Sequence, residues 1–288
     1  MVRILAIGDF HGKLTVKLKK LIEKYEFDMI ISQGDFCADR GRTIFFKKCY
    51  GKDLELWDVI GKKKYEKLTK QNEKDGETII SYLKKLGKPL FVVTGNHDHA
   101  GQKEIGYTKE VSSYVYPIPL TLNYLNKLKI PVLDFAKTNF AGFDLIGYPR
   151  SSYPGIPSKS WKAGKTMRIN EEKIKKDYKV HKKKMSKFFK GAKNTIFISH
   201  NVPYMTKLDN ISQKGHVLAR NKHYGSYLVK QLIKKYQPRL VIAGHMHENP
   251  GKIRIGKTIV VNPGAAMDGR AALIELTDKH IRVRFINT

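Results

Sequence analysis

Ala243-Gly244-His245-Met246-His247-Glu248 follows the short apolar run Pro238-Arg239-Leu240-Val241-Ile242 late in the chain. Such a run is typical of a buried strand, so the two histidines stand just past a strand end. In extended backbone, side chains two residues apart point the same way, and both imidazoles can face one point. Neutral imidazole is the commonest metal-ligating side chain. The alternative is a pair of loop histidines without a ligand, and the rest of the chain decides between the two.

Length and composition set the outer limits. A chain of 288 residues allows one large α/β domain or two small ones, and 41% hydrophobic residues argue against wholesale disorder. We expect one domain over residues 1–288, with insertions around 42–76 and 149–190. Only Cys37 and Cys49 occur, which excludes a disulfide framework and fits a reducing cytoplasm. The apolar start is too short for a signal peptide, and no run approaches the roughly 20 residues that span a bilayer. We therefore expect a soluble cytoplasmic protein without a membrane partner.

The charge is strongly positive. The chain carries 55 Lys plus Arg against 26 Asp plus Glu, a formal net charge of +29. A basic field attracts anions, so nucleic acid is one candidate partner and general solubility is the other explanation. The run Lys182-Lys183-Lys184 is by default a solvated helix face.

The first predicted strand, residues 2–7, ends at Gly8-Asp9-Phe10-His11-Gly12. Asp9 and His11 repeat the spacing of the late histidines, and the glycines allow close approach of backbone and ligand. A carboxylate with an imidazole suits Mn, Fe, Zn or Ni. The alternative is a turn in which Asp9 caps the helix that we expect over residues 15–25.

Two further strands end in the same way. Residues 28–32 run into Gly34-Asp35, and residues 89–93 run into Thr94-Gly95-Asn96-His97-Asp98-His99. Strand ends at one edge of a parallel sheet are where α/β enzymes place ligands. Asn96 can supply a metal-binding oxygen, His97 then points towards a substrate, and Asp98 can orient His97 through a hydrogen bond. A turn-rich loop of small polar residues remains the alternative.

Hydrophobic periodicity, together with turn and capping residues, predicts several other elements. We expect residues 42–76 to be charged and irregular, with a short helix near Trp57, and residues 149–164 to form a long loop. Helices are predicted over 77–86, 170–190 and 227–236, and a strand over 194–199 that ends at His200. Hairpins are predicted for 132–135 with 143–148 and for 253–255 with 258–261, and antiparallel strands for 271–276 and 280–285.

Five predicted strand ends thus carry residues with ligand chemistry. The set comprises two carboxylates, one amide and four histidines: Asp9, His11, Asp35, Asn96, His200, His245 and His247. Seven ligands are too many for one tetrahedral zinc ion. They suit two metal ions that share a bridging carboxylate, roughly 3.5–4 Å apart.

As an ordered set, Gly8-Asp9-Phe10-His11-Gly12, Gly34-Asp35, Gly95-Asn96-His97-Asp98, His200 and Gly244-His245-Met246-His247 resemble the calcineurin-like metallophosphoesterase superfamily, and Asn262-Pro263-Gly264 is similar too. The resemblance implies an α/β fold, a four-layer α/β/β/α sandwich of two mixed sheets flanked by helices. It implies one metal held by Asp9, His11, Asp35 and His247, and a second held by Asp35 as the bridge with Asn96, His200 and His245. It also implies that His97 is catalytic, with Asp98 as its partner.

One motif differs from its counterpart in the protein phosphatase branch of the superfamily. The protein phosphatase branch of the superfamily reads Gly-Asp-x-x-Asp-Arg-Gly, whereas Gly34-Asp35-Phe36-Cys37-Ala38-Asp39-Arg40-Gly41 has an extra residue. The insertion shifts Arg40, which can contact a phosphate or pair with Asp39. A protein serine/threonine phosphatase is therefore not expected.

The expected function is a metal-dependent phosphoric ester hydrolase. Two divalent ions, with manganese favoured over iron, nickel, cobalt or zinc, would neutralise the phosphoryl oxygens, and a metal-bridging hydroxide would attack phosphomono- or phosphodiesters. His97 would protonate the leaving group or stabilise the charge that develops on it. A nuclease that uses the same site is the alternative, motivated by the net charge. A binding scaffold without activity is the third hypothesis, and the complete ligand set argues against it.

Overall fold

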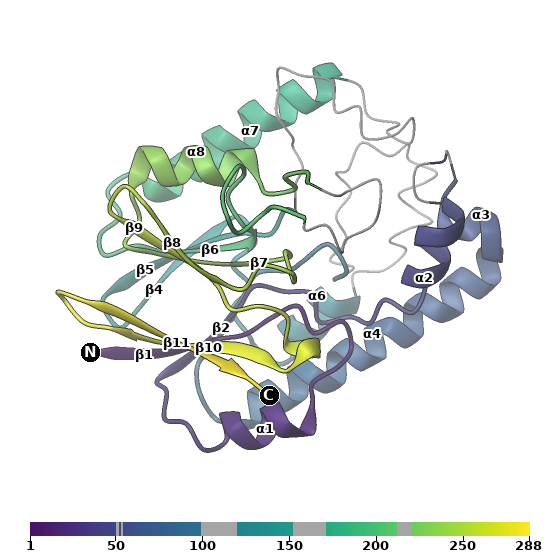
Figure 1. Cartoon of the computed structure of the whole chain (residues 1–288), viewed down its shortest axis with the longest axis horizontal. Helices are drawn as coiled ribbons and strands as arrows, with labels where there is room; N and C mark the ends of the chain where they lie inside the picture. The colour runs from purple at the N-terminus through teal and green to yellow at the C-terminus, as the bar shows by residue number, and fades with distance from the viewer. Residues whose placement is uncertain (50–51, 53, 99–119, 152–170, 212–220) are drawn as a thin grey trace.

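β1 (Val2–Ala6) lies in the middle of a 5-stranded sheet built from both ends of the chain (Figure 1). The computed structural model describes residues 1–49, 52, 54–98, 120–151, 171–211 and 221–288. In space the strands run β11 (Ile281–Asn287), β10 (Arg270–Leu276), β1, β2 (Met29–Ser32) and β3 (Leu90–Val92). β1 pairs parallel with β2 and antiparallel with β10, so the sheet is mixed.

The second sheet has 6 strands and is mixed as well. Its order is β4 (Ala136–Phe140), β5 (Phe143–Tyr148), β6 (Ile196–Asn201), β7 (Leu240–Gly244), β9 (Thr258–Asn262) and β8 (Gly251–Ile255). The four central strands are parallel, while β4 and β8 run antiparallel at the two edges. The predicted hairpin that became β8 and β9 is confirmed.

Three hydrophobic clusters define the layers, because alternate residues of a strand face opposite sides of its sheet. Leu5 and Ile7 pack against α1 (Val16–Ile22), α4 (Lys62–Lys85) and α6 (Leu120–Lys127). Ile4 and Ala6 pack between the two sheets, against residues such as Ile198 and Ile242. On the far side of the second sheet, Phe197 and Val241 pack against α7 (Glu171–Phe189) and α8 (Tyr227–Tyr236). The order helix, sheet, sheet, helix confirms the predicted four-layer sandwich (Figure 1).

Helix ends follow the local sequence. The Ser226 hydroxyl accepts a bond from the Val229 backbone N–H at 3.3 Å and begins α8, which ends at Gln237 in the left-handed conformation. The predicted helix over 227–236 is therefore confirmed. α4 and α7 are long but highly charged. Among the described helices, none has the length and apolar character needed to cross a membrane.

The short helix expected near Trp57 is confirmed, but the described part of residues 42–76 is otherwise more regular than predicted. These residues form α2 (Arg42–Ile44), the π-helix η1 (Phe45–Cys49), α3 (Leu56–Ile60) and the first part of α4, which runs unbroken through the helix predicted at 77–86. The buried residues of that first part are polar, and Glu73 accepts a bond from the Thr121 hydroxyl at 2.8 Å. Hydrophobic periodicity cannot detect a face that is buried through polar contacts.

The predicted hairpin partner of β5 was also misplaced. Val132 and Leu133 do not enter the second sheet, because Leu133 donates to the Val92 carbonyl at 2.8 Å and Val132 bridges to Val92 of β3. The partner is instead β4, whose side chains alternate between intermediate and exposed. An edge strand needs few apolar residues, so β4 lacked the signal on which the prediction relied.

Candidate metal centre

The loops after β1, β2 and β7 hold polar residues in an unusual backbone conformation. Asp9, His11, Asp35 and His245 have φ angles of 53°, 44°, 56° and 68°. The left-handed region costs an L-residue roughly 1–2 kcal/mol, and such strain concentrates at functional sites. Hydrogen bonds between the loops stabilise this backbone conformation. The His245 N–H donates to both carboxylate oxygens of Asp9 at 3.0 Å, and the His11 N–H donates to the Asp35 carbonyl at 2.9 Å.

The first group of side chains brings Asp9, His11, Asp35 and His247 together, with one potential ligand atom of each within 4.8 Å of the others. The two Nε2 atoms of His11 and His247 lie 3.1 Å apart. Nε2 of His11 lies 3.5 Å from Oδ2 of Asp35, and Nε2 of His247 lies 3.6 Å from Oδ1 of Asp9. Residues 236 positions apart in sequence therefore face a common point.

The second group contains Asp35 again, with His200 and His245. Nε2 of His200 lies 3.6 Å from Oδ2 of Asp35 and 2.8 Å from Oδ1 of Asn96. His200 belongs to β6 itself, at a register shift between Ser199 and Asn201. A bulge of this kind redirects a side chain, and here it aims His200 at the site. Asp35 is common to both groups.

The donor chemistry of these groups fits divalent cations. Nδ1 of His200 lies 2.7 Å from the Gln33 carbonyl and donates to it, which directs Nε2 at Oδ1 of Asn96 and Oδ2 of Asp35. Burial lowers the pKa of His11 to about 2 and the pKa of His245 well below its ordinary value, so both imidazoles are neutral. The neutral imidazoles of His11 and His245 beside buried carboxylates match the N/O donor set of a transition metal.

The ionisation of Asp35 is consistent with this environment. Burial opposes its charge, but the neighbouring histidines and the backbone N–H of His97, which donates to Oδ1 at 2.8 Å, lower the pKa of Asp35 below its ordinary value. The carboxylate therefore carries a negative charge between the two groups of ligands, where a bridge between two cations would need it.

Asp98 forms other hydrogen bonds than the one to His97 that the sequence suggested. Its Oδ2 accepts the N–H groups of Asp35 and Gly95 at 2.7 and 2.9 Å, and its Oδ1 accepts those of Phe36 and Cys37 at 2.7 and 3.2 Å. The expectation was a hydrogen bond to the His97 ring. A short buried carboxylate is better placed to satisfy the backbone donors of a tight loop, so Asp98 ties the loop after β2 to the loop after β3.

The carboxylate that faces His97 is Asp39. Nε2 of His97 lies 3.8 Å from Oδ2 of Asp39, which is within ion-pair range but too long for a direct hydrogen bond. The His97 ring also packs edge-on against His11, with the ring centroids 4.8 Å apart. Sequence reasoning placed Asp39 only beside Arg40, whereas Arg40 forms an ion pair with Asp75 of α4. The extra residue in the motif from Gly34 to Gly41 did not indicate that the Asp39 carboxylate faces His97.

Two motif glycines give the ligands room. A Cβ atom at Gly95 would overlap Oδ1 of Asp35, and one at Gly244 would overlap Oδ2 of Asp9. Asn262 stabilises the loop after β7, because its Nδ2 donates to the carbonyls of Met246 and Asn249 at 2.8 and 2.9 Å. Arg270 donates to the His247 carbonyl at 3.1 Å, a contact without any sequence signal.

Comparison with known proteins agrees with this geometry. Residues 168–286 match the family model described as metallophosphoesterase, calcineurin superfamily. The resemblance to the calcineurin superfamily is confirmed. The matched part includes His200, His245 and His247, while the calcineurin-type motifs around Asp9, Asp35 and Asn96 lie before it.

Solved structures with the same fold cover the whole chain. TT1561 of Thermus thermophilus has a TM-score of 0.56 at 16% identity and covers 98% of each chain. A dimetal phosphatase from Danio rerio has a TM-score of 0.53 at 10% identity, covering 99% of this chain and 96% of its own. Among curated proteins, the uncharacterized protein MJ1162 of Methanocaldococcus jannaschii is 34% identical over 82 residues, which is 28% of this chain and 35% of that protein. The identities are low, so the solved structures speak for the fold alone.

Proposed function

We propose that the chain is a dinuclear-metal-dependent phosphoesterase that hydrolyses phosphomonoesters or phosphodiesters. The observation that carries this proposal is the sharing of Asp35 between two groups of potential ligands, each completed by histidines from other loops. A single metal site would not need the same buried carboxylate on two sides. The match of residues 168–286 to the metallophosphoesterase family model supports the same chemistry.

The residues take distinct roles in this proposal. Asp9, His11 and His247 would hold one cation, Asn96, His200 and His245 the other, and Asp35 would contact both. Bound there, two divalent cations would neutralise the phosphoryl oxygens and lower the pKa of water. His97 is not in either group and would donate a proton to the leaving oxygen, while Asp39 would hold the His97 ring in place. Asp98 would act only through the backbone that positions Asp35 and His97.

Activity after metal reconstitution is the direct test. The purified protein would be stripped with a chelator, dialysed and loaded in turn with Mn, Fe, Co, Ni and Zn, and then assayed on an aryl phosphomonoester and an aryl phosphodiester. We expect hydrolysis of at least one ester that depends on added metal. We expect a stoichiometry of two metals per chain in the wild type and loss of both in Asp35→Ala, since both groups share this residue. One metal retained by Asp35→Ala with unchanged affinity would contradict a shared bridge.

The metal and the compartment belong to the same proposal. Mixed nitrogen and oxygen ligation accommodates several first-row ions, and we favour manganese with a cytoplasmic location. Competition between equimolar ions in the dialysis buffer, read out by elemental analysis, would rank them.

A further inference from the structure

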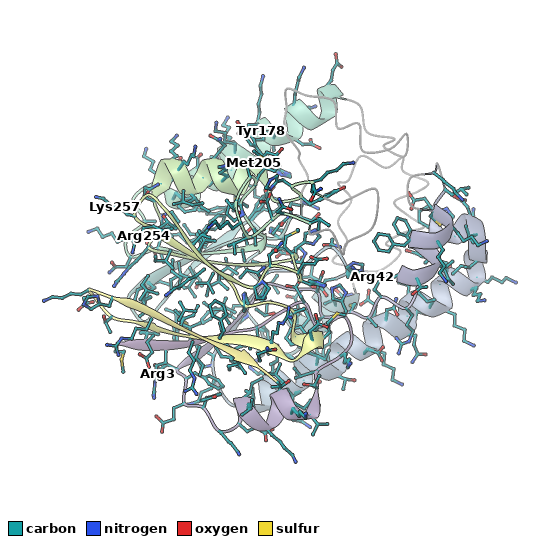
Figure 2. All side chains as sticks on the ribbon, in the orientation of Figure 1. Arg3, Arg42, Tyr178, Met205, Arg254 and Lys257 are labelled. Carbon is teal, nitrogen blue, oxygen red and sulfur yellow. The ribbon has the colours of Figure 1, made fainter. Side chains whose placement is uncertain are left out.

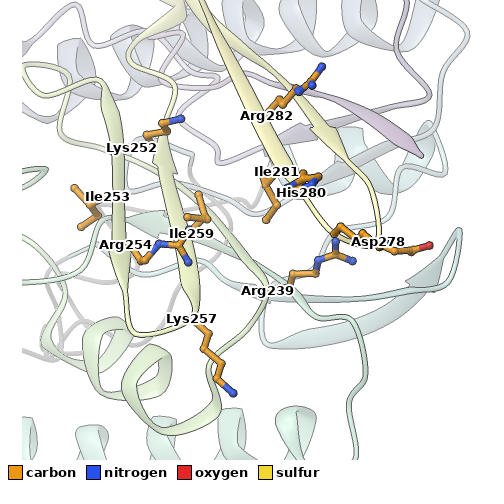
Figure 3. Close-up of a pocket in the computed structure, with 11 residues that line it drawn as sticks. Arg239, Lys252, Ile253, Arg254, Lys257, Ile259, Asp278, His280, Ile281 and Arg282 are labelled. Atoms are coloured by element: carbon orange, nitrogen blue, oxygen red, sulfur yellow. The ribbon is translucent and has the colours of Figure 1, made fainter.

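A second concave, charged feature lies away from the metal centre. A pocket of about 620 Å³ opens between the β8–β9 hairpin and the β10–β11 hairpin (Figure 3). Six of its lining residues are basic and one is acidic: Arg239, Lys252, Arg254, Lys257, Lys279 and Arg282, against Asp278. Only 11 of the 55 basic residues of the chain are arginine, yet three of these six are. Arginine is the residue suited to bidentate phosphate contacts.

The pocket has an apolar floor and a cationic rim. Ile259 and Ile281 lie at the margin of the cluster between the two sheets, where the sheets separate at the edge strand β8. Lys252 and Arg254 alternate with core-facing residues along β8, so both project from one face of the hairpin. In Figure 3, Arg239, Lys252 and Arg254 surround the space between the hairpins, whereas the Lys257 ammonium points away from it.

Among the described residues, Arg239, Lys252 and Arg254 have no ion-pair partner. In the described part of the chain, no carboxylate lies within 4.0 Å of a side-chain nitrogen of Arg239, Lys252 or Arg254. Six basic groups gathered in a hollow with a single carboxylate, Asp278, create a local positive potential that attracts anions. A pocket of this volume is within the range of ligand sites.

The pocket is distinct from the metal centre. Arg239 precedes β7, and the ligand His245 follows it, so the two sites lie roughly 20 Å apart along the strand at about 3.3 Å per residue. Figure 2 places Arg254 and Lys257 at one end of the molecule and Arg42 of α2 at the other. A ligand bound in the pocket therefore does not need to contact the reacting ester.

We propose that this pocket binds single-stranded nucleic acid, with Arg239, Lys252 and Arg254 on consecutive phosphates. Charge complementarity selects a phosphate chain, and the apolar isoleucine floor with the imidazole of His280 gives unpaired bases a surface that the paired bases of a duplex cannot reach. The inference does not depend on the proposed phosphoesterase activity, because it concerns other residues and is measured by binding.

The test is fluorescence anisotropy with a labelled 20-nucleotide single strand, the matching duplex and inorganic polyphosphate, over a range of salt. The pocket variant is Arg239→Gln/Lys252→Gln/Arg254→Gln. The control is Lys17→Gln/Lys20→Gln/Lys24→Gln, three exposed residues on and after α1 that remove the same charge. Removal of three phosphate contacts should reduce the slope of log K against log salt by about 2, and weaken single-strand binding about tenfold or more at low salt. The control should retain both values within about twofold.

Several outcomes would overturn the proposal. Equal losses in the pocket variant and the control would indicate that net charge alone attracts the strand. An equal loss of duplex binding would remove the single-strand assignment, and polyphosphate binding as tight as the single strand per phosphate would remove the nucleic-acid assignment. Turnover of a small aryl phosphodiester should remain at the wild-type level in the pocket variant. If no preparation hydrolyses any ester, the phosphoesterase proposal fails while the binding result still stands.

Discussion

His97 is not one of the seven residues proposed as ligands, although it lies beside them in a group with His11 and Asp39. His97→Ala should retain two metals per chain and lose roughly 10²–10⁴ in kcat, the usual contribution of a positioned proton donor. Elemental analysis and steady-state kinetics on an aryl phosphodiester would be measured on the same preparation. Wild-type turnover in this variant would show that the role given to His97 is wrong.

Asp39 gives a more graded prediction. Asp39→Asn keeps the shape but removes the charge that faces Nε2 of His97 at 3.8 Å. We expect kcat to fall by about tenfold, less than in His97→Ala, with KM and metal content unchanged. In a His97→Ala background the Asp39→Asn change should have no further effect, because the group that it positions is gone. If the two substitutions reduce kcat by independent, multiplicative factors, Asp39 does not act through His97.

Gly95 tests how tightly the site is packed. Gly95→Ala introduces a methyl group where Oδ1 of Asp35 lies, so the bridging carboxylate must move and both metals should be lost or bind much more weakly. Gly61→Ala is the matched control: with φ at 79° and open space around its Cβ, it should lower the free energy of unfolding by roughly 1–2 kcal/mol but keep the metals. Metal content after dialysis distinguishes the two.

Asp98 connects the loop after β2 to the loop after β3, so its substitution should lower the stability of the fold. Asp98→Ala leaves the N–H groups of Asp35, Phe36, Cys37 and Gly95 without their buried acceptor, at a cost of roughly 3 kcal/mol or more. Asp98→Asn keeps one oxygen, and with it two of the four bonds, so it should lose about half as much. Urea unfolding of both metal-free variants measures this. Equal stability of Asp98→Ala and wild type would mean that the loops are held by other contacts.

The predicted elements succeeded where one face of an element is apolar. Val241 and Ile242 mark β7 as a buried strand, and Ser226 marks the start of α8, so both were found with nearly the right bounds. The first half of α4 was missed because Asn72 and Glu73 face the interior through hydrogen bonds. The recurrence of ligand residues at strand ends identified all seven clustered side chains, since parallel strands deliver their ends to one edge. Backbone contacts such as those of Asp98 and Arg270 could not be read from side-chain type.

The whole molecule should depend on its metals for part of its stability. The folded chain brings the ligands together, whereas the unfolded chain does not, so bound metal favours the folded state. At a free metal concentration about 100 times Kd, a single site contributes about 2.7 kcal/mol. With roughly 2–4 °C per kcal/mol for a chain of this size, removal of metal by a chelator should lower Tm by at least about 5–10 °C.

Differential scanning calorimetry with and without chelator measures this difference. Asp35→Ala serves as the control, because a variant that binds no metal should give the same Tm in both buffers. A wild-type protein that carries two metals and melts at the same temperature after their removal would contradict the expected coupling.

The position of β1 between β2 and β10 has a consequence for biosynthesis. β1 pairs with β10 from Val2 with Leu276 to Ala6 with Ala272, and the Ala266 N–H donates to the Gly8 carbonyl just before Asp9. β1 must therefore wait for β10, which follows much later along the chain, before this edge is covered. Until Arg270 and the residues after it emerge, a nascent chain presents the apolar strand that carries Asp9 with one side unpaired. The clustered side chains that follow β1 therefore reach their final surroundings only after β10 has been synthesised.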